Sequence, residues 1–171
     1  MFSFVHTRAF ARSSAVLLAA VTLIGAAPAS AVESQPTMSI IVITHPPVVP
    51  LLVQGAGIGA VRTFYTPVDV RGSGGGTHYM TGTLTTTAKT ADGGREIRVA
   101  NLVFVLGRSF NQIVVGGVAY YPADGSTLAV GDKAVRPIIG GSGRYARAHG
   151  WVVSTNLGDA GWRHEFHVST Q

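Results

Sequence analysis

The chain has 171 residues, no cysteine, and 13 lysines and arginines against 8 aspartates and glutamates, which gives a formal net charge of +5. The lack of cysteine excludes disulfides, thiolate zinc sites and thiol catalysis, so core burial and backbone pairing must hold the fold. The basic residues are spread singly along the chain instead of forming a stripe, which argues against a nucleic-acid partner.

Residues 1–31 have the features of a secretory signal peptide. Arg8 and Arg12 precede the apolar run AVLLAAVTLIGAA, and Ala29-Ser30-Ala31 forms an Ala-x-Ala cleavage site. The run is shorter than the roughly 20 apolar residues that span a bilayer, and no twin-arginine motif precedes it. We therefore expect secretion to the extracellular space or the periplasm through the general secretory (Sec) route, with no membrane partner after signal removal.

Residues 32–59 are expected to form an N-terminal tail or an extended strap. Prolines at positions 46, 47 and 50 remove backbone donors from this segment and disfavour a central strand. A β-rich run near Ser39–Thr44 is nevertheless expected to be extended.

Residues 60–171 read as a series of short strands. β-rich runs alternate with Gly, Asp, Asn and Pro, and no stretch has a helical period of 3.6 residues. In Thr77–Thr87 the threonines at odd positions share one face, whereas Met80 and Leu84 share the other, which is typical of an antiparallel sheet with one drier face. Strands are expected near Ser39–Thr44, Val61–Val70, His78–Thr90, Glu96–Leu106, Gln112–Tyr121, Thr127–Val130, Ala134–Ile139, Ala146–Thr155 and Arg163–Ser169.

The expected fold class is all-β, a small closed antiparallel eight-stranded β-barrel. About eight short strands suit a barrel or a sandwich. A barrel leaves no free sheet edge, which favours it for an exported chain without disulfides. The expected domain division is a signal peptide at 1–31, a tail or strap at 32–59, and the barrel at 60–171.

One segment carries a resemblance to a known family. Residues 138–152, IIGGSGRYARAHGWV, resemble the VVGGTGxFxxARGxA segment of dirigent proteins and the GGSGxFxGxxGxV segment of allene oxide cyclases. The sequence DGSTLAV at 124–130 is similar to the dirigent NGSTLxV strand, and a last strand at 162–168 closes the chain as it does in the family. The resemblance, over 61–169, implies a calycin-type barrel whose lumen binds a small hydrophobic molecule and orients it for cyclisation or coupling without a cofactor.

The same resemblance suggests site residues. His149 stands where dirigent proteins have the arginine of Ala-Arg-Gly, and strand alternation places it on one face with Arg147 and Trp151. A shift of one residue in register would turn that face outward. The glycines of the motif should allow a tight turn and close strand approach at Gly150. The candidates are His149 and Asp69 as catalytic residues, and Arg147, Trp151, Tyr65 and Tyr145 as ligand-binding residues, with Tyr145 at the end of the barrel.

Each candidate also has a purely structural interpretation. His149 could be a hydrogen-bonded strand histidine, and Asp69 a solvated residue at a strand end. Trp151 and Tyr145 could serve in packing alone.

Three other motifs carry little weight. The sequence GAGIGA at 55–60 matches a dinucleotide fingerprint, but the residues after it cannot form the helix that this site needs. Ser142 lies outside any Gly-x-Ser-x-Gly elbow, which argues against a serine hydrolase. His164 and His167, three apart on a strand, should point to opposite faces and so should not share a metal.

The sequence therefore favours a secreted barrel that binds a small hydrophobic molecule and steers its chemistry without a cofactor or a metal. The alternative is a non-catalytic carrier or a structural surface barrel. A His–Asp pair facing an open lumen would favour the first, and a lumen filled by side chains the second. The oligomeric state, a homo-oligomer included, is left open.

Overall fold

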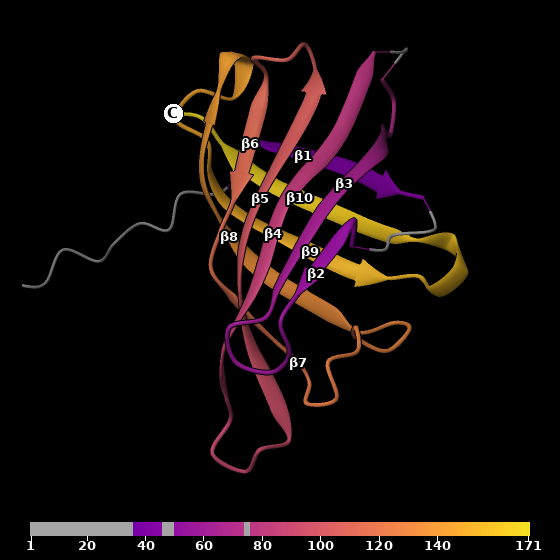
Figure 1. The fold of residues 1–171 in the computed structure, drawn as a ribbon. Coiled ribbons are helices and arrows are strands. Elements are labelled where there is room, and N and C mark those ends of the chain that lie inside the picture. Colours follow the sequence, from indigo (N-terminus) through magenta and orange to yellow (C-terminus); the bar gives the residue numbers. More distant parts are fainter. Residues whose placement is uncertain (1–35, 46–49, 74–75) are drawn as a thin grey trace, which may run out of the picture. The chain divides into compact units, whose positions relative to one another are not determined.

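The computed structural model describes residues 36–45, 50–73 and 76–171, and the expected signal peptide lies outside them (Figure 1). Within the described residues nearly all regular structure is β. No helix there is long and apolar enough to cross a membrane. The elements are β1 (Met38–Thr44), β2 (Leu52–Gln54), β3 (Val61–Val70), β4 (Thr77–Lys89), β5 (Arg95–Gly107), β6 (Gln112–Val115), β7 (Val118–Pro122), β8 (Lys133–Ser142), the 3-10 turn η1 (Gly143–Tyr145), β9 (His149–Asn156), the 3-10 turn η2 (Gly158–Ala160) and β10 (Trp162–Ser169).

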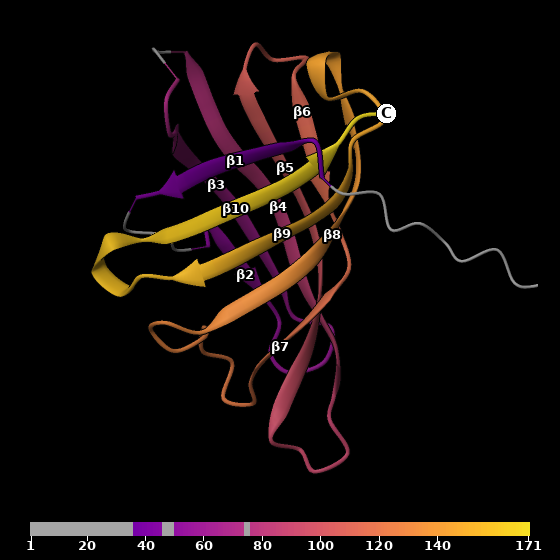
Figure 2. The same cartoon turned by 180° about the vertical axis from the view of Figure 1, so that it is seen from behind.

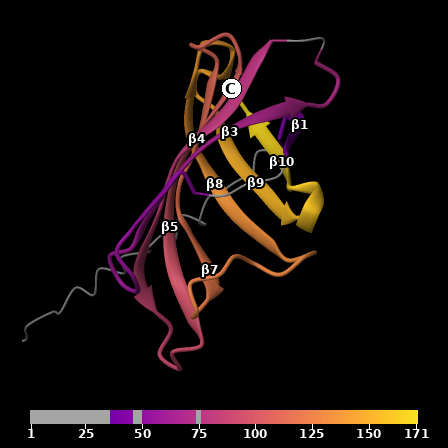
Figure 3. The same ribbon diagram turned by 45° about the vertical axis from the view of Figure 1, so that its right-hand side comes forward.

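The strands close into the eight-stranded antiparallel barrel that the sequence predicts. Their order is β1-β10-β9-β8-β6-β5-β4-β3, and β1 pairs with β3 to complete the ring. β6 and β7 both pair with β5 and act as one interrupted strand, whereas β2 adds to β3 outside the ring. Figure 2 shows β1 and β10 side by side, and Figure 3 shows β3, β4 and β5 across the barrel from β8, β9 and β10.

Two segments differ from the sequence-based expectation. β1 confirms the strand expected near Ser39–Thr44, but it lies within the range 32–59 expected as a tail or strap, and its Val42 and Thr44 are fully buried in the ring. The prolines that weakened the expectation come after β1 in the sequence, so the strand itself is uninterrupted. Residues 127–130, expected as a strand, form a loop whose Leu128 carbonyl accepts a 2.7 Å hydrogen bond from the side-chain Nδ2 of Asn156.

The alternation along β4 is confirmed, and it sets the inside of the barrel. Met80, Leu84 and Thr86 are buried, whereas the threonines of the other face remain partly or fully exposed. One half of the interior is filled by packed apolar side chains, including Phe104 and Phe166, whose rings meet edge to face at 4.8 Å. Each such buried side chain contributes about 1.5–3 kcal/mol. The other half of the interior is open.

Gly150 confirms the close strand approach expected from the motif. Its φ is 124°, and a Cβ atom there would overlap the backbone carbonyl oxygen of His167 on β10. We expect Gly150→Ala to lower the free energy of unfolding by about 1–2 kcal/mol, measured by chemical denaturation. Gly140→Ala is the matched control, because nothing lies within 4 Å of its added Cβ. Equal stability of the two variants would contradict the prediction.

Candidate functional site: a charged cavity in the barrel

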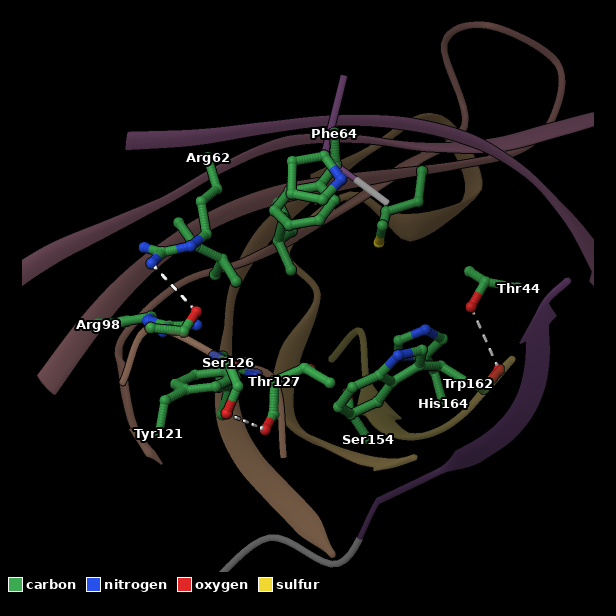
Figure 4. Close-up of a pocket in the computed structure, with 16 residues that line it drawn as sticks. Thr44, Arg62, Phe64, Arg98, Tyr121, Ser126, Thr127, Ser154, Trp162 and His164 are labelled. Atoms are coloured by element: carbon green, nitrogen blue, oxygen red, sulfur yellow. Dashed lines mark hydrogen bonds between the residues drawn. The ribbon is translucent and has the colours of Figure 1, made fainter. Parts of the chain in front are cut away.

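The open half of the barrel contains a cavity of about 180 Å³ (Figure 4). Most of the strands of the ring contribute to its wall, and so does the loop at 125–127. The lining residues are Thr44, Pro50, Arg62, Phe64, Met80, Leu84, Arg98, Leu102, Tyr121, Gly125, Ser126, Thr127, Arg136, Ser154, Trp162 and His164.

Charged side chains occupy inward positions of three strands. Arg98 shares the inward face of β5 with Leu102 and Phe104, and both of those residues are buried. Arg62 lies on the same face of β3 as Phe64. Arg136 lies on the same face of β8 as two buried apolar neighbours. We call Arg62, Arg98 and Arg136 the lumen arginines. Strand alternation, which normally directs apolar residues inward, here directs three cations inward as well.

Glu96 neutralises part of this charge. The Arg98 side chain donates a 2.9 Å hydrogen bond from Nε to Glu96 Oε2, with its Nη2 2.7 Å from the same oxygen. Thr86 Oγ1 donates to that oxygen at 3.1 Å, and Arg62 lies 3.7 Å away. Burial alone would raise the pKa of Glu96, but the hydrogen bonds and charges of Arg98, Thr86 and Arg62 together hold it below its ordinary value. Glu96 is therefore a carboxylate near neutral pH.

Arg136 has no such partner. Its side chain is 3% exposed, and its Nη2 donates a 2.8 Å hydrogen bond to the Tyr121 hydroxyl. Its Nε has no hydrogen-bond partner, and no carboxylate pairs with it among the residues that the structure describes. Arg98 lies over the face of the Tyr121 ring at 4.3 Å from the centroid. Among the residues that the structure describes, the lumen thus holds three guanidinium groups against one carboxylate.

A neutral histidine, His164, lies on β10, which is separated from β8 by β9. His164 Nδ1 is 2.9 Å from Ser154 Oγ, and its ring meets Phe104 edge to face at 5.0 Å. Burial, together with the charge of Arg136, lowers the pKa of His164 from 6.5 to about 3. Its Nε2 is buried and has no hydrogen-bond partner in the described part of the chain. The imidazole is therefore held in place by two contacts and keeps one free nitrogen.

Apolar side chains form much of the remaining cavity wall. Phe64, Met80, Leu84, Leu102 and Trp162 contribute carbon surface between the arginines and the histidine. Figure 4 shows Arg62, Arg98 and Tyr121 on one side of the pocket and Ser154, Trp162 and His164 on the other. The cavity can therefore hold a molecule with a polar group at each end and an apolar body.

The candidates on the glycine-rich motif do not line this cavity. The inward face of β9 carries Val152 and Ser154, so His149 and Trp151 point outward, the register shift that the sequence left open. Trp151 stacks on His167 outside the barrel, with centroids 4.9 Å apart. Arg147 precedes β9 with a φ of 63° and is exposed, so it does not continue the strand face.

The other three candidates also lie outside the cavity. Asp69 is exposed and pairs with the His45 imidazole at 2.6 Å, so no His149–Asp69 pair forms. Tyr65 is exposed on β3 and packs on Tyr79 at a ring distance of 5.3 Å. Tyr145 is buried in η1 at the packed end of the barrel, where the motif predicted an aromatic plug.

Sequence reasoning considered His164 only as half of a metal pair, and it missed the other polar residues of the cavity. His164 points inward and is buried, whereas His167 points outward and stacks on Trp151, as the spacing of three predicts. A usable signal was present: Ala134 and Ile138 lie two residues on either side of Arg136, and Arg98 lies two residues before Ala100 in an alternation that continues through Leu102 and Phe104. Charges in the apolar phase of a strand mark an inward polar site.

Comparisons with known proteins support the fold. No known family matches the chain, and no curated protein does. Among solved structures, pyocyanin demethylase is similar with a TM-score of 0.52 and 18% sequence identity, over 77% of this chain and 98% of that one. At this identity the likeness shows a shared small barrel fold.

Proposed function

We propose that the barrel binds a small anion with an apolar, single-ring body in its lumen, and that it orients this molecule for cyclisation or coupling without a cofactor. The observation that carries the proposal is Arg136, a buried cation that no carboxylate in the described residues neutralises. An unpaired buried charge costs several kcal/mol. The negative group of a ligand would offset that cost by pairing with the free Nε.

The size of the cavity limits the ligand. An apolar cavity of about 150 Å³ accepts benzene, so one of about 180 Å³ suits a single aromatic ring with small substituents. Phe64, Leu84 and Leu102 supply apolar contacts for the ring. The ligand class is therefore a monocyclic aromatic carboxylate or a similar unsaturated acid.

Orientation and electric field are what the barrel would contribute to a reaction. A fixed pose can supply several kcal/mol of a barrier, and fixed cations stabilise negative charge that develops in a transition state. The motif at 138–152 supports a dirigent-like or allene-oxide-cyclase-like role, and the name of pyocyanin demethylase describes an enzyme on a barrel of this fold. The features of residues 1–31 support secretion.

A non-catalytic carrier is the second candidate. Glu96 is kept charged by its arginines, and His164 is kept neutral by burial and Arg136. Neither group changes protonation near neutral pH, so neither is suited to shuttle a proton there. If the protein is a carrier, the lumen binds and releases the same acid without altering it.

Arg136→Met tests the proposal. We expect the affinity for benzoate, measured by calorimetry, to fall about 10- to 100-fold, because the substitution removes the cation that lacks an internal partner. Stability should be unchanged or higher, since an unpaired buried charge is replaced by an apolar side chain. Arg108→Met, on the exposed surface, is the control and should bind benzoate like the wild type. Binding of benzamide as tightly as benzoate, or unchanged affinity in Arg136→Met, would sink the proposal.

A further inference from the structure

We infer that His164 is a specificity-determining residue for a second polar group: the lumen prefers a ligand that carries a hydroxyl at the end remote from its anion. This inference rests on the proposed function and adds to it the identity of the ligand's other end. The ligand class becomes a hydroxylated aromatic acid.

The position of the free nitrogen supports this assignment. His164 is 5% exposed, yet it lines the cavity and its Nε2 lacks a partner in the described residues. Ser154 at 2.9 Å and the Phe104 ring fix the imidazole from two sides. A buried polar atom without a partner costs about 1–3 kcal/mol. A ligand group that hydrogen-bonds Nε2 recovers that free energy, so the cavity favours molecules that have one.

Arg136 and His164 come from strands of the ring that are not neighbours. Arg136 on β8 faces Val152 of β9, and His164 on β10 faces Ser154 of β9 from the other side. The backbones of β8 and β10 are therefore two strand spacings apart, about 10 Å. Figure 4 shows Arg62 and Arg98 on one side of the pocket and His164 on the other. A single ligand can contact both only if its polar groups flank an apolar body.

The chemistry of the imidazole selects the group. In one tautomer Nε2 donates a hydrogen bond, and in the other it accepts one. A hydroxyl can do both, so it suits either tautomer. Burial and Arg136 keep the pKa of His164 at about 3, so the ring carries no charge to offset a second carboxylate. A hydroxy acid therefore fits better than a diacid or a methyl ether.

Calorimetry with five defined acids tests the inference on the purified protein. We expect the better of 3- and 4-hydroxybenzoate to bind at least 10-fold more tightly than benzoate. 4-Methoxybenzoate and terephthalate should gain nothing over benzoate. His164→Phe should remove the hydroxyl preference, so that the hydroxybenzoate and benzoate bind this variant with similar affinity. His167→Phe, an outward substitution three residues further along β10, should keep the preference.

A second measurement does not depend on the variant's folding. The ¹⁵N resonance of His164 Nε2 in the wild type should shift on addition of the hydroxybenzoate, and should shift less with benzoate. Failure of benzoate itself to bind would overturn the proposed function. Benzoate binding without a hydroxyl preference, a preference retained in His164→Phe, or an unmoved resonance would overturn this inference alone.

Discussion

Glu96→Gln is expected to lower the free energy of unfolding by about 3–5 kcal/mol, the largest effect of any single substitution in the lumen. Removal of one partner of a buried ion pair leaves the other charge uncompensated in a poorly solvated site. Here the carboxylate contacts Arg98 at 2.7 Å and Arg62 at 3.7 Å, and Glu96 itself is 2% exposed. The variant would hold three guanidinium groups and no anion. Urea denaturation followed by circular dichroism measures the loss.

Two further variants separate charge from side-chain packing. Glu165→Gln removes a carboxylate whose partner, Arg163, is partly exposed, and surface pairs contribute only about 0–1 kcal/mol. The double substitution Glu96→Gln with Arg98→Met removes both members of the close pair and should recover part of the lost stability. A loss of less than about 1 kcal/mol in Glu96→Gln would show that the network is not a buried ion pair in solution.

The strands were predictable because the sequence alternates clearly. Along Thr77–Thr87 every second residue is threonine or tyrosine, and only one pleated register buries Met80 and Leu84 together. The place of β1 in the barrel was harder to predict than the strand itself, because its pattern is short and prolines follow it closely. Its place in the ring is fixed by pairing with β10 and β3, which are distant in sequence. Loop residues 127–130 have strand-like composition, but no neighbouring strand pairs with them.

The site was less predictable than the fold, since a one-residue difference in register reverses every side chain of a strand. His149 and Trp151 lie outside the barrel for this reason, whereas Ser154 of the same strand lines the cavity. Glu96 and Arg98 are two residues apart in sequence, but their partner Arg62 comes from a distant strand. The excess of cations over carboxylates in the cavity arises only when closure of the ring brings these distant strands together. No local pattern contains it.

Acid should destabilise the protein through the buried imidazole of His164. The folded-state pKa of His164 is about 3, below the ordinary value of 6.5, because the ring is buried near Arg136. Between these values the unfolded chain binds a proton that the native state excludes. The free energy of unfolding therefore falls as the pH falls, by up to about 1.4 kcal/mol per pH unit. We expect a loss of about 2 kcal/mol between pH 6.5 and 4.5, and about 4 kcal/mol by pH 3.

The upper part of that range isolates the histidine. Glu96, Asp92 and Asp124 all have pKa values below their ordinary ones, so the stability that they contribute is lost only at lower pH. His164→Phe should flatten the dependence between pH 6.5 and 4.5, whereas His167→Phe on the outer face of the same strand should keep it. Urea unfolding at half-unit pH steps gives the slopes. The same steep fall in His164→Phe would mean that another group takes up the proton on unfolding.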